Sequence, residues 1–498
     1  MAAPPLMLDA ETRARLWRQL VNAIETYTTK LETGRVTPPL DPAKLRALLS
    51  RFDFSAPVDA FEALDFLIEG LWKFQTHTPH PRYYGLFNPA PTTMGIAGDA
   101  LVAAFNPQLA AWGHSPLAIE VEQHLVRAFG ARFGYDPAKT DGTFASGGME
   151  ANHTAVLTAL VQAFPEFPSR GVRALAAQPV LYVSAEAHHS LLKAARLCGL
   201  GTDAVHEIPV EDSLCMNPEV LASRIVQDRG RGFAPFMVAA TAGTTNAGAI
   251  DPLAAVAEVA AREKLWLHVD AAWGGAAALV PELRPLLDGI ERADSITFDA
   301  HKWLSVPMGA GIYITRHTDI LDRTFRTAVR YMPREAEELD VVDPCMHSIQ
   351  WSRRAIGLKV FLSLAVAGWE GYTTAIRQMV AMGALLREQL KASGWQVVNE
   401  TPLPLCCFVD QRHAEGRSAA YLHAVAMKVV GSGKAWISTT RLANSLPVLR
   451  ACITNYRTSG DDIAALIGAL EEARRQLRQN PAENTACSGA ANLRTFAV

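Results

Sequence analysis

The sequence predicts an α/β protein built on a largely parallel sheet, and three observations carry that prediction. Between residues 84 and 370, short apolar runs alternate with amphipathic helical stretches, as in repeated strand–helix units. Most runs end in a polar or glycine-rich segment, where open sheets of this kind bind ligands. The chain has 498 residues, 49% hydrophobic and 19% charged, which suits one large core with smaller satellites.

Composition and charge exclude several classes of function. A net charge of −3 provides no basic surface for nucleic acid, and no run approaches the roughly 20 apolar residues of a membrane helix. The first residues lack a secretory signal, so we expect a cytoplasmic protein with no nucleic-acid or membrane partner. The seven cysteines are scattered, without the spacing of a metal site, which indicates reduced thiols and no bound metal.

The chain divides into four expected segments. Residues 1–83 read as a helical arm with helical apolar spacing in 11–32 and Pro-rich interruptions, too small to form its own core. Residues 84–370 form the large α/β domain, and 371–480 a small α+β domain closed by a helix near 461–477. Residues 481–498 lack any periodic pattern, and we expect a mobile tail there.

Lys302 is the first candidate for chemistry. It follows an apolar run and lies between Phe298 and Trp303 in the segment FDAHKW. Loss of water around a lysine favours the neutral amine that forms imines, whereas a lone lysine after a strand is more often a solvated surface charge.

Asp270 ends another apolar run, in LWLHVDAAWGG. A carboxylate at a strand end can keep the nitrogen of a pyridine cofactor protonated, and the following Ala271 and Ala272 are small enough to admit a flat ring. Taken by itself, a carboxylate at this position more often caps the next turn.

Three further strand tips carry polar groups. Residues 146–148 (Ser-Gly-Gly) precede a helix, where exposed backbone N–H groups suit a phosphate, although most such turns are only turns. His188 and His189 lie at a strand–helix junction, where an imidazole could stack on a ring or move protons; a solvated helix start is the alternative. Thr244 and Thr245 place hydroxyls at the end of a fifth run.

The order of these pieces is similar to that of a known family. The chain resembles the group II pyridoxal 5′-phosphate (PLP)-dependent amino-acid decarboxylases of fold type I, which include aromatic-L-amino-acid, tyrosine, histidine and glutamate decarboxylases. The resemblance covers about residues 70–470. It rests on the segments ASGGMEAN, AHHSLLKA, TAGTTNAGAIDPL, HVDAAWGG, ADSITFDAHKWL and RACITNYRT. It implies the fold type I architecture, a mainly parallel sheet of the seven-stranded type.

The resemblance also implies roles for individual residues. Lys302 would bind PLP as a Schiff base, Asp270 would contact the pyridine nitrogen, and His188 would stack on the ring. The other implied cofactor contacts are Ala272 on the opposite ring face, Thr245 near the ring substituents, and the backbone of Gly148 and Met149 with Ser295 and His301 at the phosphate.

Two positions depart from the animal aromatic decarboxylases. Met149 stands where a hydroxyl residue is common, which removes a side-chain contact to the phosphate. Asp299 replaces a common asparagine, so its side chain either faces away from the phosphate or lies close enough to need a proton.

The implied reaction is decarboxylation of an L-amino acid to an amine and CO2. Tyr331, in a charged segment typical of a closing loop, matches the family's proton donor, although a surface tyrosine in a linker remains the alternative. Relatives that form aldehydes typically lose this tyrosine or the stacking histidine, so the presence of Tyr331 and His188 favours simple decarboxylation over an aldehyde synthase.

The resemblance favours an aromatic substrate. Trp112, Phe87 and Tyr84 match segments that line the pocket of aromatic decarboxylases, and an aromatic wall favours burial of an aromatic side chain. Arg450 matches a position that can meet an acidic side chain, so aspartate, glutamate and cysteine sulfinate are the alternative substrates. The resemblance further implies a homodimer with shared active sites.

Overall fold

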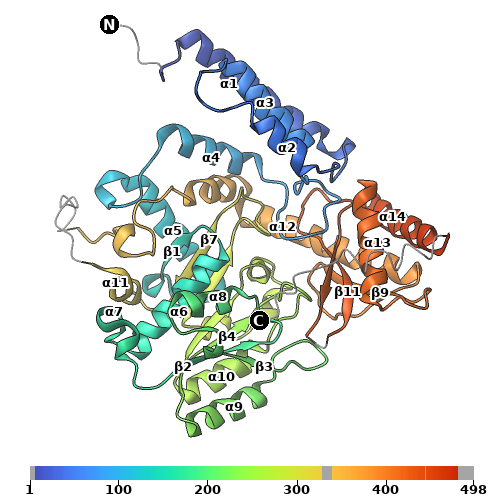
Figure 1. The fold of residues 1–498 in the computed structure, drawn as a ribbon. Helices are drawn as coiled ribbons and strands as arrows, with labels where there is room; N and C mark the ends of the chain where they lie inside the picture. The colour runs from blue at the N-terminus through green and yellow to red at the C-terminus, as the bar shows by residue number, and fades with distance from the viewer. Residues whose placement is uncertain (1–5, 328–338, 444, 480–498) are drawn as a thin grey trace.

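An arm of three helices stands out from a body that contains two sheets (Figure 1). The computed structural model describes residues 6–327, 339–443 and 445–479. The helices of the arm are α1 (Ala10–Lys30), α2 (Pro42–Leu49) and α3 (Ala60–Lys73). Aspartates at 9, 41 and 59 start them, because each carboxylate accepts hydrogen bonds from free N–H groups of the first turn.

The larger sheet has seven strands in the order β1-β7-β6-β5-β4-β2-β3. Only β7 runs antiparallel to its neighbours, so the predicted mainly parallel seven-stranded sheet is confirmed. The strands are β1 (Asp141–Ala145), β2 (Pro179–Ser184), β3 (Val205–Ile208), β4 (Ala234–Thr241), β5 (Trp266–Asp270), β6 (Ser295–Asp299) and β7 (Gly311–Thr315).

Helices bury both faces of this sheet. Along β4, Met237 and Ala239 join the core beneath α6 and α8, whereas Val238 and Ala240 join the larger core on the other face. This alternation is the two-residue period of a strand, and burial on both sides explains why the strands read as continuous apolar runs. The helices of the large domain are α4 (Thr93–Phe105), α5 (Pro116–Phe133), α6 (Gly148–Ala163), α7 (Phe167–Arg170), α8 (Ser190–Leu197), α9 (Pro218–Gly230), α10 (Leu253–Glu263) and α11 (Ile320–Phe325).

The small domain is an antiparallel sheet in the order β10-β11-β9-β8, with two helices against it. Its elements are β8 (Trp395–Val397), β9 (Leu405–Asp410), α13 (Ala419–Ser432), β10 (Ser438–Arg441), β11 (Pro447–Cys452) and α14 (Gly460–Gln479). Helix α12 (Gly357–Ala392) links the two domains and is kinked at Gly368, where φ is 63°. The expected boundary at residue 370 falls just after this kink.

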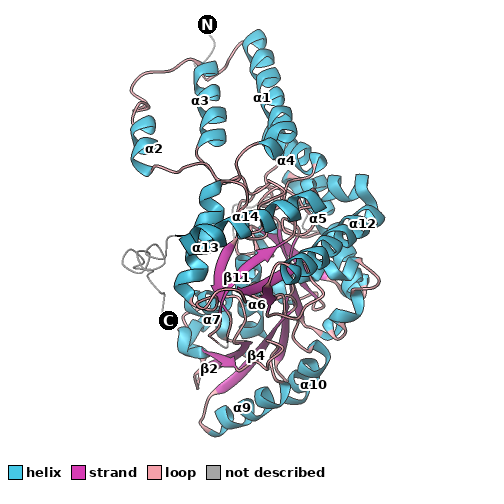
Figure 2. Ribbon diagram, turned by 90° about the vertical axis from the view of Figure 1, so that its right-hand side faces the viewer, coloured by secondary structure: helices cyan, strands magenta, loops and turns pink. Residues whose placement is uncertain are grey.

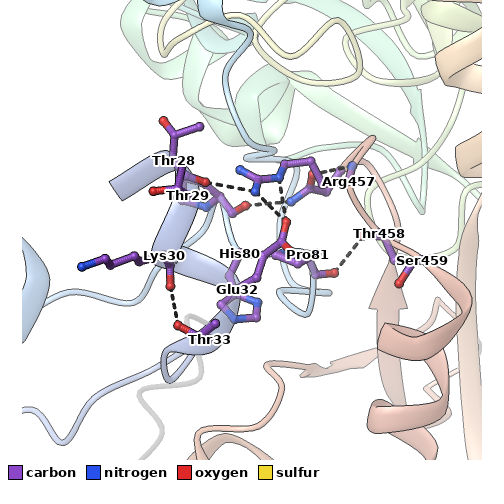
Figure 3. Close-up of polar contacts among 12 residues, drawn as sticks. Thr28, Thr29, Lys30, Glu32, Thr33, His80, Pro81, Arg457, Thr458 and Ser459 are labelled. Carbon is purple, nitrogen blue, oxygen red and sulfur yellow. Dashed lines mark hydrogen bonds and ion pairs between the residues drawn. The ribbon is translucent and has the colours of Figure 1, made fainter. Parts of the chain in front are cut away.

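Polar groups connect the arm to the body. The Arg457 guanidinium donates hydrogen bonds to Glu32 Oε1 at 2.9 and 2.6 Å and to the Thr28 carbonyl at 3.0 Å (Figure 3). Helix α1 has no buried residue, and the Trp17 side chain is 62% exposed. Figure 2 shows the three helices standing clear of both sheets, so much of their apolar surface is uncovered in a single chain. Among the described helices, none is long and apolar enough to cross a membrane.

Candidate active site

The predicted functional residues meet at one edge of the large sheet. Strands β1 and β6 both run antiparallel to β7, so β1, β2, β4, β5 and β6 all end at this edge. Gly148 follows β1, His188 follows β2 and Thr245 follows β4. Asp270 ends β5, and Lys302 comes three residues after β6. Convergence of five strand ends is the usual construction of a ligand site in an open α/β sheet.

Asp270 is held by a side chain of α6 and by a backbone N–H of the turn that follows β5. Its side chain is 5% exposed, Oδ2 accepts a hydrogen bond from Asn152 Nδ2 at 2.8 Å, and Oδ1 accepts one from the Ala272 N–H at 3.1 Å. Asn152 lies on α6 and also donates to Ser190 Oγ at 2.7 Å. A carboxylate has about four acceptor sites, so Asp270 keeps capacity for one more donor, as a protonated pyridine nitrogen would be.

His268 supports this arrangement from beneath. Complete burial lowers the pKa of His268 to about 4, so the ring is neutral near pH 7. Its Nε2 lies 3.0 Å from Asn152 Oδ1 and its Nδ1 lies 2.9 Å from Ser295 Oγ. With the proton on Nε2, His268 donates to the Asn152 oxygen and thereby aims the amide nitrogen at Asp270.

Ser295, predicted at the phosphate, lies away from the other predicted phosphate contacts. Ser295 is fully buried at the start of β6, where its hydroxyl accepts a hydrogen bond from Trp266 Nε1 at 2.9 Å and bonds to His268. The five residues of β6 span roughly 13 Å, so this hydroxyl lies at the far end of the strand from Lys302. Ser295 supports the Asp270 network instead.

Lys302 lies beside a second carboxylate. Its Nζ is 3.0 Å from Asp299 Oδ2 and 5.4 Å from the centre of the Phe87 ring. Asp299 ends β6 and is 2% exposed, whereas the Lys302 side chain is 21% exposed. The amine is therefore reachable from outside and its charge is paired.

The start of α6 lies against the Asp299 carboxylate. A Cβ added to Gly148 would lie 2.9 Å from Asp299 Oδ2 and 3.3 Å from Ala272 Cβ, so any side chain at 148 would displace its neighbours. His301 packs beside this turn, its Nδ1 accepts a hydrogen bond from the Ala310 N–H at 2.9 Å, and burial lowers its pKa. The N-terminus of a helix, free of side chains, suits a phosphate.

His188 carries a neutral ring at the same edge. Desolvation lowers its pKa although part of the ring remains exposed; the Lys302 charge acts in the same direction, and Asp270 opposes it. The Ser190 N–H donates to His188 Nδ1 at 3.2 Å, which leaves the proton of the neutral ring on Nε2. A flat, uncharged imidazole here is suited to cover a cofactor ring.

Two of the four predicted substrate residues lie near Lys302. The Phe87 ring stacks on Trp273, with ring centres 4.7 Å apart, and lies 5.1 Å from the Arg450 guanidinium carbon. Arg450 donates to the Thr245 carbonyl at 2.8 Å and to the Gly85 carbonyl at 2.6 Å. Its Nη2 is buried without a hydrogen-bond partner among the described residues.

The other two predicted substrate residues, Tyr84 and Trp112, make contacts within the chain that hold the fold together. Tyr84 is fully buried, and its backbone pairs with Trp436 and Cys452 of the small domain. Trp112 belongs to a separate small apolar cluster, and its indole N–H donates to Glu120 Oε1 at 2.9 Å. Tyr331, the predicted proton donor, lies outside the described residues.

Sequence reasoning missed Asn152 and His268. His268 stands two residues before Asp270 on β5, so both side chains point to the same face, and this spacing could have identified it. Asn152 lies within ASGGMEAN, but its contact with Asp270 spans 118 positions and has no local signal. Among the described residues, no cluster of His, Cys, Asp or Glu could hold a metal ion.

The residues at this edge fit PLP at its ring. Asp270 offers a carboxylate for the ring nitrogen, Ala272 has only a methyl side chain, and the Lys302 amine is reachable. The phosphate end fits PLP less well, because the Asp299 carboxylate lies against Gly148 and would repel a second negative group there.

Comparison with known proteins agrees with this geometry. The pyridoxal-dependent decarboxylase conserved domain matches residues 46–411. Aromatic-L-amino-acid decarboxylase of Bacillus atrophaeus is 31% identical over 473 residues, covering 93% of this chain and 95% of that protein. Human cysteine sulfinic acid decarboxylase is 31% identical over 412 residues, 82% of each chain.

A solved structure extends the likeness to the whole fold. Oryza sativa TDC, crystallised with PLP and tryptamine, superimposes with a TM-score of 0.88 at 25% identity, covering 96% of this chain and all of that one. The matched domain and the relatives cover most of the chain. The chain therefore belongs to the pyridoxal-dependent decarboxylase family and is a PLP-dependent amino-acid decarboxylase.

Proposed function

We propose that the chain decarboxylates an aromatic L-amino acid and releases the corresponding amine and CO2. The observation that carries this proposal is Phe87, a buried ring that lies 5.4 Å from Lys302 Nζ and stacks on Trp273. An aromatic side chain bound near Lys302 would gain both apolar burial and ring contacts from Phe87. The aromatic-L-amino-acid decarboxylase of Bacillus atrophaeus supports the same choice.

In this proposal each residue at the sheet edge has one task. Bound PLP supplies the electron sink that makes loss of CO2 feasible. Asp270 keeps the ring nitrogen protonated, and Asn152 and His268 hold that carboxylate in place. Lys302 anchors the cofactor, and His188 covers the ring and excludes water from that face.

Arg450 favours a second candidate, an amino acid with an acidic side chain. Two of its guanidinium nitrogens bind carbonyl groups, but Nη2 is buried without a partner among the described residues. A buried guanidinium N–H is a strong donor for a carboxylate. Human cysteine sulfinic acid decarboxylase is a relative that acts on such a substrate.

A substrate screen with two variants separates these candidates. CO2 release should be measured for the twenty amino acids, dihydroxyphenylalanine and cysteine sulfinate. We expect the highest kcat/KM with an aromatic amino acid, a large loss of that activity in Phe87→Ala, and a smaller one in Arg450→Met. A preference for an acidic amino acid that Arg450→Met abolishes would replace the first candidate with the second.

The product distinguishes decarboxylation from aldehyde formation. We expect an amine with no stoichiometric aldehyde or hydrogen peroxide, and Tyr331→Phe should raise the aldehyde fraction if Tyr331 reprotonates the product. Lys302→Ala is the control, because it should abolish both CO2 release and the visible absorption band that borohydride removes from the PLP-loaded enzyme.

We also propose that the active form is a homodimer. Apolar side chains exposed in one chain include Trp17 (62%), Leu67 (59%), Leu71 (57%) and Phe105 (81%), on helices α1, α3 and α4. Large apolar side chains that gather on an exposed surface are normally covered by another protein surface. Sedimentation should give twice the 54.0 kDa of one chain, and a monomer that keeps full activity would contradict the proposal.

A further inference from the structure

We propose that Asp299 determines the affinity of the enzyme for PLP. In the free enzyme its carboxylate occupies the anion-binding end of the site, and the cofactor phosphate has to compete with it. The inference concerns loading of the cofactor and does not depend on which amino acid is the substrate.

The carboxylate lies where an anion would bind. Its Oδ2 is 2.9 Å from the position of a Cβ on Gly148, the first residue of α6, and its Oδ1 is 2.9 Å from that of a Cβ on Gly311. Lys302 Nζ lies 3.0 Å from Oδ2, and His301 Nε2 lies 3.9 Å from the same oxygen. The helix N-terminus and the ammonium group both attract a negative charge.

The carboxylate is also incompletely satisfied. Asp299 is 2% exposed, and Oδ1 has no hydrogen-bond partner among the described residues. A buried acceptor without a partner is unfavourable, so the Lys302 ammonium is the main group that stabilises the charge here. Among the described residues, the main partner of this carboxylate is therefore the Lys302 amine, to which the cofactor would attach.

Cofactor binding changes this balance in two ways. The phosphate would bring negative charge to the N-terminus of α6, against which the Asp299 carboxylate lies. Like charges repel strongly in a buried site. Attachment of the cofactor to Lys302, with loss of water, would also turn the ammonium partner of Asp299 into an imine nitrogen that carries at most one N–H. Both effects weaken PLP binding, so removing the charge of residue 299 should strengthen it.

The test uses two substitutions and two ligands. Full-length apoenzyme carrying Asp299→Asn or Asp299→Ala is titrated with PLP and with pyridoxal, which lacks the phosphate, and the borohydride-sensitive absorption band is followed. We expect the Kd for PLP to fall by at least about tenfold in both variants, with a clearly smaller change for pyridoxal. Asp288→Asn, which removes a 74% exposed carboxylate, should leave both Kd values within about twofold of the wild type.

Inorganic phosphate provides a measurement independent of Lys302 chemistry. We expect phosphate to raise the Tm of the Asp299→Asn apoenzyme and to change that of the wild type little. Unchanged or weaker PLP binding in both variants would overturn the proposal. An equal gain for PLP and pyridoxal would also overturn it, since Asp299 would then act only through Lys302. Tighter PLP binding in Asp299→Asn with weaker binding in Asp299→Ala would assign the gain to the new amide donor instead.

Discussion

Asp270 and Asp299 end neighbouring parallel strands, and both carboxylates are almost fully buried. Asp270 accepts hydrogen bonds from Asn152 and from a backbone N–H, so neutral donors hold it whether or not a cofactor is present. Asp299 has one oxygen against Lys302 and one without a partner among the described residues. In our proposal, this difference prepares Asp270 for the loaded enzyme, whereas the charge of Asp299 is paired with an ammonium group only in the free enzyme.

The largest effect should come from Asp270→Asn. The amide keeps the size of the side chain but cannot sustain protonation of the ring nitrogen, so kcat should fall by at least roughly 10³-fold. The borohydride-sensitive band should still form, because Lys302 is untouched. If kcat for CO2 release stayed within tenfold of the wild type, Asp270 would not be the partner of the ring nitrogen. The contrast drawn here between Asp270 and Asp299 would then fail.

The network under Asp270 should make stability depend on pH. The pKa of His268 is about 4 in the folded chain and about 6.5 when unfolded, so the unfolded state binds more protons between these values. Stability is therefore lost as pH falls from about 6.5 to about 4, by up to about 3 kcal/mol from this group.

Urea unfolding of the apoenzyme across this pH range would measure the effect. His268→Gln should be less stable than the wild type at pH 7 and should lose less stability on acidification. Equal pH slopes in the two proteins would contradict the assignment of a neutral, buried His268.

Asn152→Ala should make the surroundings of Asp270 resemble those of Asp299, because Oδ2 loses its side-chain donor. Loss of a group that orients another typically costs 10- to 100-fold in activity, and we expect kcat to fall by about that range. Gln162→Ala is the matched control on the same helix, since Gln162 accepts a hydrogen bond from Arg323 in an exposed contact away from the site. It should leave kcat unchanged; equal losses of kcat in both variants would mean a general effect on α6.

The smallest effect concerns the phosphate end. Met149→Ser adds a hydroxyl in the first turn of α6, and one net hydrogen bond is worth about 0.5–1.5 kcal/mol, or roughly 2- to 10-fold in the Kd for PLP. Titration of the wild-type and Met149→Ser apoenzymes with PLP at constant pH would measure this change in Kd, and the Tm of each protein would be the control for stability. Weaker binding at unchanged Tm would place the phosphate away from this turn.

The sequence predicted the elements whose signal is local. Strands β1, β2, β4, β5 and β6 were recognisable because burial on both faces makes them apolar runs, and the candidates Lys302, Asp270 and His188 were read from their tips. Strands β3 and β10 were missed because their side chains are partly exposed and they include polar residues.

Side-chain direction and long-range contacts were harder to predict. Ser295 was assigned to the phosphate from its likeness to a motif, although the strand carries it to the opposite end of the sheet. Asn152 contacts a residue 118 positions away. Trp112 packs against a small apolar cluster formed mainly by α4 and α5. The predictions for Tyr331 and for residues 481–498 fall outside the described residues.

Arg450 has a consequence for the order of folding. Its guanidinium joins β11 to carbonyl groups 205 and 365 positions earlier in the chain, at Thr245 and Gly85. Contacts of such sequence separation close large loops and form late. The Asp270 and Asp299 ends of the site can assemble within the large domain, whereas the Phe87 side requires the small domain to dock. If the proposed site residues are right, a chain that has buried its main sheet but has not docked its last strands would bind the cofactor before it can bind the amino acid.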